Sequence, residues 1–394
     1  MSYLGKLLDG VDVEWKALGD VAVLKRGKTI TAKDKVDGNI PVISGGQKPA
    51  YFNSEYNQVG ETITVAGSGA YAGYLAFWNT PIFVSDAFSI KPNLDFLNTR
   101  YLYHFLLLNQ KWIYNLQKGS GVPHVYPKDL AVLLIPIPPL AVQSEIVRIL
   151  DNFTELTAEL TAELTARKKQ YKHYRDKLLR FEGKDVEWKA LSEIGEFIRG
   201  KRFTKADYVE DGIRVIHYGE IYTRYGVFAH EAISQVRNDL AASLRYAKPG
   251  DVVITDVGET VEDVGKAVAW LGDKDVAIHD HCYAFRHALN PKFVSYCMQT
   301  DSFIAQKAKY VASTKVHTLL ISGFSKIAIP VPYPNDPGKS LGEQARIVAI
   351  LDKFDALTNS ITEGLPREIE LRQKQYEYYR DLLLSFPNSQ ELTQ

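Results

Sequence analysis

The sequence of 394 residues lacks the features that mark disulfide-bonded, secreted or membrane-spanning proteins. Its two cysteines cannot form a disulfide scaffold, and they suit a reducing cytoplasm. It contains no run of about 18 apolar residues, so we expect no membrane-spanning helix. The first 15 residues contain no long apolar stretch and predict no secretory signal. We therefore expect a cytoplasmic protein.

Net charge is lacking as well, because 47 Lys and Arg residues balance 47 Asp and Glu residues. Since basic surfaces hold phosphates, zero net charge taken alone argues against a nucleic-acid partner. The balance is uneven along the chain: residues 165–182 carry seven basic residues against two acidic ones, a net charge of +5 (7 − 2). Zero net charge therefore does not exclude a nucleic-acid partner, because the relevant charge is local.

What the sequence does contain is a globular composition and an internal repeat. Hydrophobic residues at 45% and charged residues at 24% are ordinary for folded proteins, and the length allows about two to four domains. Residues 12–18 and 185–191 both read Asp-Val-Glu-Trp-Lys-Ala-Leu, at an offset of 173 (185 − 12). Two shorter motifs recur at the same offset, namely Arg-Gly-Lys at 26–28 and 199–201, and Val-Ile at 42–43 and 215–216.

Two further matches lie later in the chain. They are residues 143–153 with 344–354, at an offset of 201 (344 − 143), and residues 169–176 with 374–381, at an offset of 205 (374 − 169). The segments between the early motifs and these later matches, roughly 45–140 and 217–340, share little sequence. The order is thus globular, helical, globular, helical. Similar ends with divergent middles favour one scaffold that carries two recognition surfaces over a duplication that has only drifted.

Residues 141–181 are predicted to form one long helix. Apolar residues recur at steps of three, four and seven, and no Gly or Pro lies between 140 and 182. Pro138 and Pro139 precede the segment, where prolines are tolerated. About 40 residues would make a rod of roughly 60 Å, which is typical of a spacer or a coiled-coil arm. Within it, Thr-Ala-Glu-Leu stands twice in tandem, at 157–160 and 161–164.

The second helical segment is predicted over residues 343–386. Gly364 and Pro366 predict a break there. Because neither apolar stripe can remain in water, we expect the two segments to pack antiparallel and to relate the globular parts by approximate two-fold symmetry. The stripe residues singled out in the two segments are Leu156, Leu160, Leu164, Tyr171, Tyr174, Leu357, Ile361, Tyr376 and Tyr379.

Both globular segments are predicted to be mixed α/β. Short β-rich runs separated by Gly and Asn turns predict strands near 40–43, 61–65, 74–77 and 82–84, and near 213–216, 251–255, 267–270 and 282–285. Helices are expected over 96–117 and 292–309, and each segment closes with an apolar, proline-bearing strand. The fold class is therefore α+β, with two mixed α/β domains and two long helical regions. The predicted boundaries are 1–140, 141–182, 183–340 and 341–386, followed by a disordered tail at 387–394.

Several loops combine basic, aromatic and Gly residues. Lys, Arg and backbone N–H groups can position phosphates, and Gln, Glu, Ser, Thr and Arg can read base edges, although such loops also occur on any protein surface. The loop side chains that could make such contacts with a nucleic acid are Arg26, Lys28, Gln47, Lys48, Ser68, Tyr71, Lys118, Ser120, His124, Lys201, Arg202, His217, Tyr218, Glu220, Tyr222, Arg224, Glu259, Thr260, Thr314 and Lys315.

No catalytic motif in the sequence is convincing. Residues 258–267 have the wrong spacing for a phosphate-binding loop. Asn290-Pro-Lys-Phe293 departs from the Asn-Pro-Pro-aromatic motif of adenine methyltransferases, and a helix-opening Asn-Pro explains it better. His279 and His281 would share a strand face and could suggest zinc, but Cys282 would point away and no second ligand pair is evident. Cys297 is predicted to be a buried core thiol. We therefore assign no catalytic and no metal residue.

The repeated motifs resemble the specificity subunit of type I restriction-modification enzymes, over essentially the whole chain. The resemblance lies in the duplicated Asp-Val-Glu-Trp-Lys starts, in the proline-rich exits into 143–151 and 344–352, and in the tandem Thr-Ala-Glu-Leu units. The tandem units, with residues 357–387, are similar to the subgroup in which the number of these tetrapeptides varies.

The resemblance implies a non-catalytic subunit of a bacterial or archaeal complex. Its two target-recognition domains would each read one half of a split, asymmetric site in double-stranded DNA. Its helices would set the spacer and dock two methyltransferase subunits through the stripe residues singled out in the two helical segments, and restriction subunits would join as the motor nuclease. S-adenosylmethionine, ATP and Mg²⁺ would be used by those partners and not bound by this chain. We expect the chain alone to bind DNA weakly, and more tightly once methyltransferase subunits enclose the duplex.

Two other classes of function stay open from sequence. A fused methyltransferase or nuclease is disfavoured by the missing cofactor and metal motifs. A coiled-coil adaptor that binds no DNA is disfavoured by the two divergent globular segments.

Overall fold

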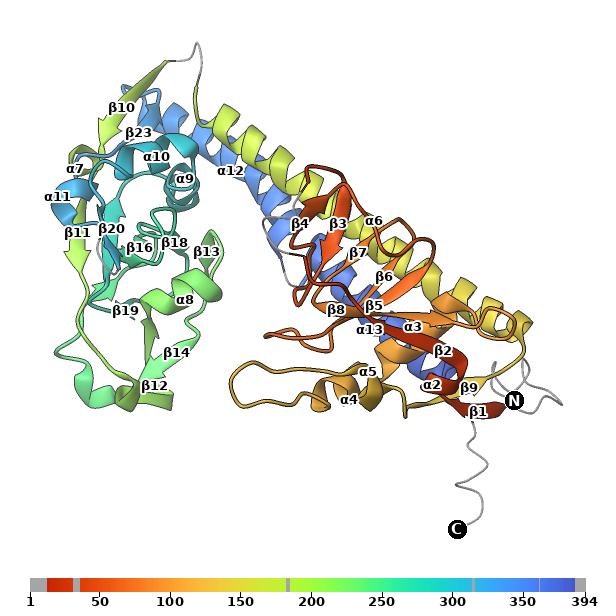
Figure 1. Ribbon diagram of the computed structural model, residues 1–394. Coiled ribbons are helices and arrows are strands. Elements are labelled where there is room, and N and C mark those ends of the chain that lie inside the picture. The colour runs from red at the N-terminus through yellow and green to blue at the C-terminus, as the bar shows by residue number, and fades with distance from the viewer. Residues whose placement is uncertain (1–12, 31–35, 182–184, 314–315, 361, 387–394) are drawn as a thin grey trace. The chain divides into compact units, whose positions relative to one another are not determined.

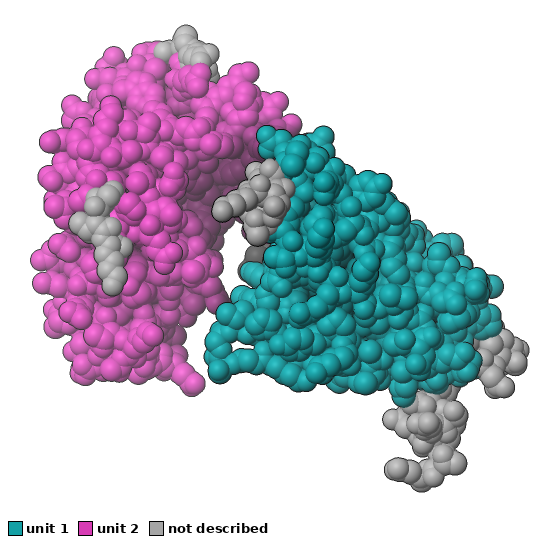
Figure 2. All heavy atoms as spheres, in the orientation of Figure 1, with its two compact units in different colours: residues 1–160, 369–394 teal, residues 161–368 magenta. Residues whose placement is uncertain are grey.

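The structure is a computed structural model that describes residues 13–30, 36–181, 185–313, 316–360 and 362–386. The chain forms two compact units, namely unit 1 (residues 1–160 with 369–394) and unit 2 (residues 161–368) (Figure 2). Each unit combines sheets, short helices and parts of the long helices, which confirms the predicted mixed α/β composition (Figure 1). The predicted boundaries of five segments stay a prediction, and the predicted tail at 387–394 lies outside the described residues.

Unit 1 is built on a four-stranded antiparallel sheet in the order β2-β8-β5-β6. A second sheet pairs β3 antiparallel with β4 and parallel with β7, and a third pairs β1 with β9. The strands are β1 (Glu14–Ala17), β2 (Ala22–Arg26), β3 (Ile40–Ile43), β4 (Tyr51–Asn53), β5 (Thr62–Ala66), β6 (Leu75–Trp78), β7 (Phe83–Val84), β8 (Ala87–Pro92) and β9 (Leu134–Ile137). The short helices are α2 (Leu18–Val21), α3 (Thr99–Leu108), α4 (Gln110–Asn115) and α5 (Pro127–Leu130).

Unit 2 has a five-stranded sheet in the order β11-β20-β16-β18-β13, a four-stranded sheet β14-β12-β19-β15, a small sheet β17-β22-β21 and the pair β10-β23. The strands are β10 (Val186–Ala190), β11 (Gly195–Arg199), β12 (Tyr208–Ile216), β13 (Phe228–Ala229), β14 (Ser234–Val236), β15 (Tyr246–Ala247), β16 (Val252–Thr255), β17 (Val257–Gly258), β18 (Ala267–Trp270), β19 (Val276–Ile278), β20 (Cys282–His287), β21 (Ala312–Ser313), β22 (His317–Thr318) and β23 (Ala328–Pro332). The short helices are α7 (Leu191–Ile194), α8 (Tyr218–Thr223), α9 (Pro291–Cys297), α10 (Asp301–Lys307) and α11 (Ile321–Phe324).

The two units share one backbone frame despite their divergent middles. The antiparallel order β2-β8-β5-β6 of unit 1 recurs as β11-β20-β16-β18 in unit 2. The repeated Val-Ile pair lies in β3, parallel to β7, and in β12, parallel to β19. Trp15 faces Pro136 across β1 and β9, and Trp188 faces Pro330 across β10 and β23.

The repeated Arg-Gly-Lys motif is explained by a close backbone approach. A Cβ atom on Gly27 would lie 2.1 Å from the carbonyl oxygen of Ser85, and one on Gly200 would lie 2.0 Å from that of His279. Only glycine fits where two backbones come this close. The motif therefore fixes the strand end from which the flanking basic residues project.

The long helices are α6 (Leu140–Leu178), α12 (Pro337–Asn359) and α13 (Gly364–Leu383). The uninterrupted α6 confirms the single long helix predicted over 141–181. The predicted break at Gly364 and Pro366 is confirmed, because Gly364 has a φ of +77° at the start of α13. α12 begins before the predicted residue 343, because Asp336 caps it by accepting a 2.9 Å hydrogen bond from the Lys339 amide.

Each unit packs helical segments from both repeats against each other (Figure 1). In unit 1, Phe153 of α6 stacks on Tyr379 of α13, with ring centroids 5.2 Å apart. In unit 2, Tyr174 of α6 stacks on Phe354 of α12 at 5.6 Å. Phe153 corresponds to Phe354 and Tyr379 to Tyr174, so the two contacts are the same contact with the repeats exchanged.

Equivalent polar networks join each sheet domain to its helix. Asp151 of α6 accepts a 2.8 Å hydrogen bond from Arg100 and lies 2.8 Å from His104. Asp352 of α12 accepts hydrogen bonds from Lys292 (2.8 Å) and Tyr296 (2.7 Å). The amides of Asn98 and Asn290 each donate to the glutamine that opens the repeated helical motif, Gln143 or Gln344, at 2.8 Å. Residues 98–104 therefore correspond to 290–296, at an offset of 192 (290 − 98).

The prediction of helical structure over 96–117 and 292–309 is confirmed, but each region forms two helices, so the single helix expected over 292–309 was wrong. Asn109 interrupts the first, where its side chain donates to the carbonyl of Phe105 at 2.9 Å. Thr300 interrupts the second, where its hydroxyl donates to the carbonyl of Cys297 at 2.8 Å. Such side chains compete with the helix for backbone hydrogen bonds. Asn290 caps α9 by accepting from the Phe293 amide, which confirms the helix-opening interpretation of Asn-Pro.

Candidate nucleic-acid interface

Four chain segments meet at one edge of the unit 1 sheet: the end of β2, the loop after β5, the turn between β7 and β8, and the hairpin around 118–124. Lys28 donates its amide to the carbonyl of Val84 at 3.0 Å, and Gly67 donates to that of Asp86 at 3.2 Å. Val125 donates in turn to the carbonyl of Gly67 at 3.1 Å. These bonds bring together segments that are separated by up to about 100 residues in the sequence.

The side chains at this edge are the ones that the sequence singled out. The guanidinium of Arg26 lies 5.4 Å from the ring centroid of Tyr126, on which His124 stacks at 6.0 Å. Ser68 donates a hydrogen bond to Asp86. Most of the predicted contact residues of unit 1 are exposed, namely Arg26, Lys28, Gln47, Lys48, Tyr71, Lys118 and Ser120. Of these, Lys118 forms an ion pair of 2.8 Å with Asp129, so its charge is partly used within the unit.

The turn between β3 and β4, which carries Gln47 and Lys48, reaches the same edge. A Cβ atom on Gly45 would lie 2.4 Å from the carbonyl oxygen of Ser68, so this turn lies directly against the loop after β5. The predicted contact residues of unit 1 thus gather on one polar edge.

Unit 2 repeats the three backbone hydrogen bonds that join these segments in unit 1. Lys201 donates its amide to the carbonyl of Ile278 at 3.0 Å, as Lys28 does to Val84. The backbone amide of Asp256 donates to the carbonyl of His281 at 3.1 Å, and its carbonyl accepts from the Leu319 amide at 2.9 Å. The backbone of Gly67 makes the same two bonds with Asp86 and Val125 in unit 1. Lys201, Arg202, Arg224, Glu259 and Thr260 are exposed. The predicted contact residues Thr314 and Lys315 lie outside the described residues.

A buried carboxylate organises the unit 2 edge. Asp256 is 2% exposed and lies 3.0 Å from the His281 imidazole and 3.6 Å from the Arg199 guanidinium. Burial raises the pKa of Asp256, and the neighbouring His281 and Arg199 oppose that shift. Sequence reasoning missed this residue, although an acid directly after the buried strand β16 was the available signal.

Three imidazoles cluster beside this carboxylate. The rings of His217 and His279 are 4.5 Å apart, and those of His279 and His281 are 5.6 Å apart. The prediction that His279 and His281 share a strand face was wrong, because both lie in the turn between β19 and β20, which is one residue longer than its counterpart in unit 1. Burial lowers the pKa of His279 to about 4. Among the residues placed by the structure, no group of three or more His, Cys, Asp or Glu side chains could hold a metal ion.

Three of the predicted contact residues in unit 2 form hydrogen bonds within the unit. His217 caps α8 by accepting from the Gly219 amide at 3.1 Å, and Glu220 accepts from the His217 amide at 2.9 Å. The hydroxyl of Tyr222 donates to Thr255 at 2.8 Å. These contacts fix α8 against the sheet. Tyr218 lies beside His281, with ring centroids 5.4 Å apart.

Eight of the nine residues assigned to spacer and docking lie on the long helices, and Ile361 lies outside the described residues. Tyr171 is buried, Tyr174 is exposed, and the others are half-buried, namely Leu156, Leu160, Leu164, Leu357, Tyr376 and Tyr379. Several basic residues between 165 and 182 form ion pairs within unit 2, among them Arg167 with Glu163, Lys172 with Asp301 and Arg175 with Asp176. The predicted local excess of charge is therefore partly neutralised.

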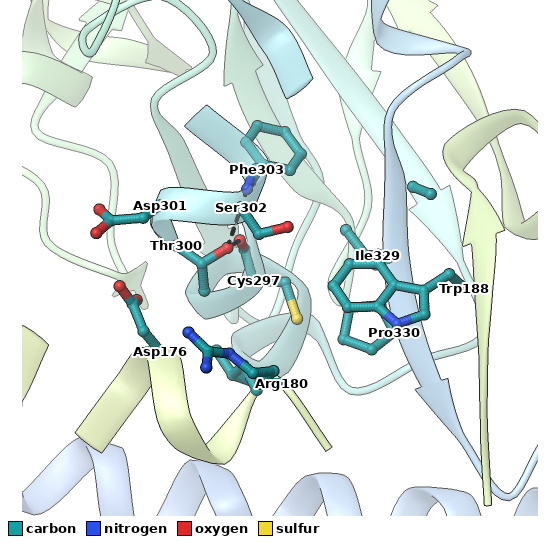
Figure 3. A pocket seen from close by; sticks show the side chains of 12 residues that line it. Asp176, Arg180, Trp188, Cys297, Thr300, Asp301, Ser302, Phe303, Ile329 and Pro330 are labelled. Atoms are coloured by element: carbon teal, nitrogen blue, oxygen red, sulfur yellow. Dashed lines mark hydrogen bonds between the residues drawn. The ribbon is translucent and has the colours of Figure 1, made fainter. Parts of the chain in front are cut away.

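A pocket of about 160 Å³ in unit 2 contains none of the predicted contact residues. Figure 3 shows Trp188, Ile329 and Pro330 on one side of it and the start of α10 on the other. In unit 1 the equivalent tryptophan, Trp15, packs edge-on against Phe105, with ring centroids 6.4 Å apart. The residue that corresponds to Phe105 is Cys297, a buried thiol as predicted, so the smaller side chain leaves the hollow.

The described helices include none that is both long enough and apolar enough to cross a bilayer.

Comparison with known proteins agrees with this architecture. The model of the type I restriction modification DNA specificity domain matches residues 10–167 and 183–371. The specificity subunit of the Escherichia coli type I restriction enzyme EcoR124I/EcoR124II is 34% identical over 428 residues, covering 100% of this chain and 99% of that protein. A putative type I specificity subunit of Haemophilus influenzae is 33% identical over 98% of each chain.

A solved structure shows the same fold at lower sequence identity. The crystal structure of a type I restriction-modification S subunit from M. genitalium is 18% identical and superposes with a TM-score of 0.57, covering 98% of this chain and 100% of that one. The family match covers most of both units, including most of α6 and all of α12. The chain therefore belongs to the family of type I restriction-modification DNA specificity subunits.

Proposed function

We propose that this chain is a non-catalytic specificity subunit in which each unit reads one half of a split, asymmetric site in double-stranded DNA. The observation that carries the proposal is the pair of equivalent edges. Both are tied by the same backbone hydrogen bonds, but they present different side chains. An invariant frame can dock on the phosphate backbone in one way, while different side chains read different bases.

The helices are proposed to pack as an antiparallel coiled coil that sets the spacer between the two halves. The exchanged contacts of Phe153 with Tyr379 and of Tyr174 with Phe354 support this pseudo-two-fold arrangement. One Thr-Ala-Glu-Leu unit adds about 6 Å and a net rotation of about 40° to a helix. One base pair adds about 3.4 Å and about 35° of twist. We place the chain in the subgroup with variable tetrapeptide number.

Insertion of a third Thr-Ala-Glu-Leu after residue 164 is expected to lengthen the recognised spacer by one base pair, because rotation matches one base pair per unit. Methylome sequencing of a strain that carries the variant with its methyltransferase measures this. As a control, an insertion of the same length in the exposed turn around Gly226 leaves the spacer unchanged. An unchanged spacer in the helix variant would contradict the ruler.

The partners follow from the family. We propose that two methyltransferase subunits dock on the helices, that restriction subunits complete the motor nuclease, and that these partners use S-adenosylmethionine, ATP and Mg²⁺. Methylation by the purified chain alone with S-adenosylmethionine would contradict the non-catalytic assignment. Tight, site-selective binding of DNA by the isolated chain would contradict the dependence on partners.

The two-module proposal is tested by exchanging residues 17–140 for the same segment of another family member. Each variant is co-expressed with the cognate methyltransferase, and its methylated sites are mapped by single-molecule sequencing. We expect one half of the recognised site to change and the other half to stay. A change in both halves, or in neither, would overturn the assignment of one half to each unit.

A further inference from the structure

The loop after the central strand carries predicted contact residues in both units. In unit 1 it follows β5 and carries Ser68 and Tyr71, and in unit 2 it follows β16 and carries Glu259 and Thr260. Each loop closes on a glycine with positive φ that donates its amide back to the strand end: Gly73 to Ala66 at 2.8 Å and Gly265 to Thr255 at 3.0 Å. The residues before these glycines, Ala72 and Val264, are therefore equivalent positions.

Both equivalent positions accept a hydrogen bond from a long side chain. In unit 1, Gln117, which follows α4, donates its side-chain amide to the carbonyl of Ala72 at 2.7 Å. In unit 2, Lys307 at the end of α10 donates its ammonium to the carbonyl of Val264 and to that of Glu262 at 2.7 Å. The same carbonyl is thus held by a neutral amide in one unit and by a cation in the other.

Burying the charge of Lys307 at this position costs free energy. Lys307 is 1% exposed, and its hydrogen bonds run to backbone carbonyls rather than to a carboxylate. Burial lowers the pKa of Lys307 to about 8, opposed by the nearby Glu262 and Asp263. A buried charge is poor evidence for a role in stability, because an apolar side chain of similar size packs there at lower cost. Its specific contribution is to hold two carbonyls of one loop in one conformation.

We propose that Lys307 is a positioning residue that fixes the loop 256–266 and thereby the choice of bases in the half-site read by unit 2. Gln117 has the same role for the loop 67–74 and the half-site read by unit 1. The inference rests on the proposed function, and it adds two residues that bind the recognition loops. They act through the loops that present Glu259 and Thr260, or Ser68 and Tyr71.

The test uses the full chain in complex with its methyltransferase. Lys307→Met keeps the length of the side chain and removes the donor, whereas Lys307→Gln restores a donor of the kind found in unit 1. Because one mismatched base pair costs about 1–3 kcal/mol, we expect Lys307→Met to reduce discrimination at one or more positions of one half-site by about tenfold or more. The other half-site stays unchanged, and Lys307→Gln recovers most of the discrimination.

Two further variants give matched controls. Lys309→Met removes an exposed lysine just beyond the same helix and is expected to change neither half-site. Gln117→Leu is expected to relax the half-site that Lys307→Met leaves intact. Relaxation of the same half-site by both variants would overturn the proposal, as would unchanged discrimination in both.

Hydrogen exchange of the free chain separates this inference from the proposed function. We expect faster exchange of amides in 256–266 in Lys307→Met, with β16 and β20 unchanged. A loosened loop with intact discrimination would overturn the positioning role while the two-module proposal stands. If replacing residues 17–140 with the segment of another family member changed neither half-site, the proposed function would fail even though Lys307 held the loop. Should Lys307→Met fail to fold, Lys307→Gln and Gln117→Leu decide the outcome by the same two measurements.

Discussion

Unit 1 and unit 2 place equivalent turns at the same sheet edge, but the turn of unit 2 is one residue longer and carries different side chains. The turn of unit 1 runs from Val84 through Ser-Asp to Ala87, and that of unit 2 runs from Ile278 through His-Asp-His to Cys282. The backbone bonds around both turns are the same, but only unit 2 adds a buried carboxylate and clustered imidazoles. The frame and the chemistry of these domains are therefore separable: glycine and backbone hydrogen bonds set the first, and loop side chains set the second.

The regions that join the sheets to the helices show the opposite behaviour. Asp151 and Asp352 contact equivalent positions of the two units. Each forms an ion pair, Asp151 with Arg100 and Asp352 with Lys292. These contacts serve the same geometric purpose in both units, so their chemistry is retained where that of the loops is not.

The largest effect is expected where the two units agree most. Gly27→Ala and Gly200→Ala would each place a Cβ about 2 Å from a backbone oxygen and lower the free energy of unfolding of that unit by about 3 kcal/mol. Hydrogen-exchange protection of each sheet measures this. Controls are Gly46→Ala, whose Cβ would meet nothing closer than 3.6 Å, and Gly226→Ala, whose Cβ would meet no described atom within 4 Å. A large loss of unfolding free energy in one unit only would contradict the shared backbone frame.

A smaller and opposite pair of effects is expected beside the two tryptophans. Phe105→Cys removes a packed ring and should lower the free energy of unfolding of unit 1 by about 2–3 kcal/mol. Cys297→Phe fills the hollow beside Trp188 and should raise that of unit 2 by about 1 kcal/mol. Urea unfolding followed by tryptophan fluorescence checks both. Cys297→Ala serves as the control that changes the thiol without filling the hollow. Equal destabilisation by the two main variants would show that the positions are not equivalent.

The last effect is confined to acidic pH and is a difference in pH dependence. Because burial lowers the pKa of His279 from about 6.5 unfolded to about 4 folded, the unfolded chain binds the proton first as the pH falls. Unit 2 should therefore lose stability between about pH 6.5 and pH 4, by about 2 kcal/mol at pH 5. His279→Ser, which introduces the residue that unit 1 has at Ser85, should remove the part of this loss that His279 contributes, while His287, whose pKa burial also lowers to about 4, keeps its own. Hydrogen exchange at pH 5 and pH 7 measures it, and the same pH slope in His279→Ser would contradict the assignment.

Much of the architecture could be predicted because it depends on local pattern. The three-four periodicity and the absence of Gly and Pro specified α6, and Gly364 and Pro366 specified the break before α13. Strand runs such as 40–43 and 267–270 coincide with β3 and β18. The two helix pairs were missed because Asn109 and Thr300 interrupt helices through side-chain bonds that periodicity does not report.

The candidate site was predicted in part. The loops rich in Arg, Lys, Gly and aromatic residues do gather at one edge of each unit, but Asp256, Lys307 and Gln117 were not singled out. Their roles depend on which carbonyl or imidazole lies beside them, and those neighbours are 25 or more residues away in the sequence.

The sequence by itself determined the duplication, the long helices and the family, because repeated motifs and helical periodicity are local properties of the chain. Only the tertiary structure decided that the divergent middles share one frame. It also showed that helices from both repeats pack within each unit, and that a buried lysine in one unit corresponds to an amide in the other. Those features arise from backbone hydrogen bonds and side-chain packing between segments distant in sequence, which residue types and spacing do not encode one position at a time.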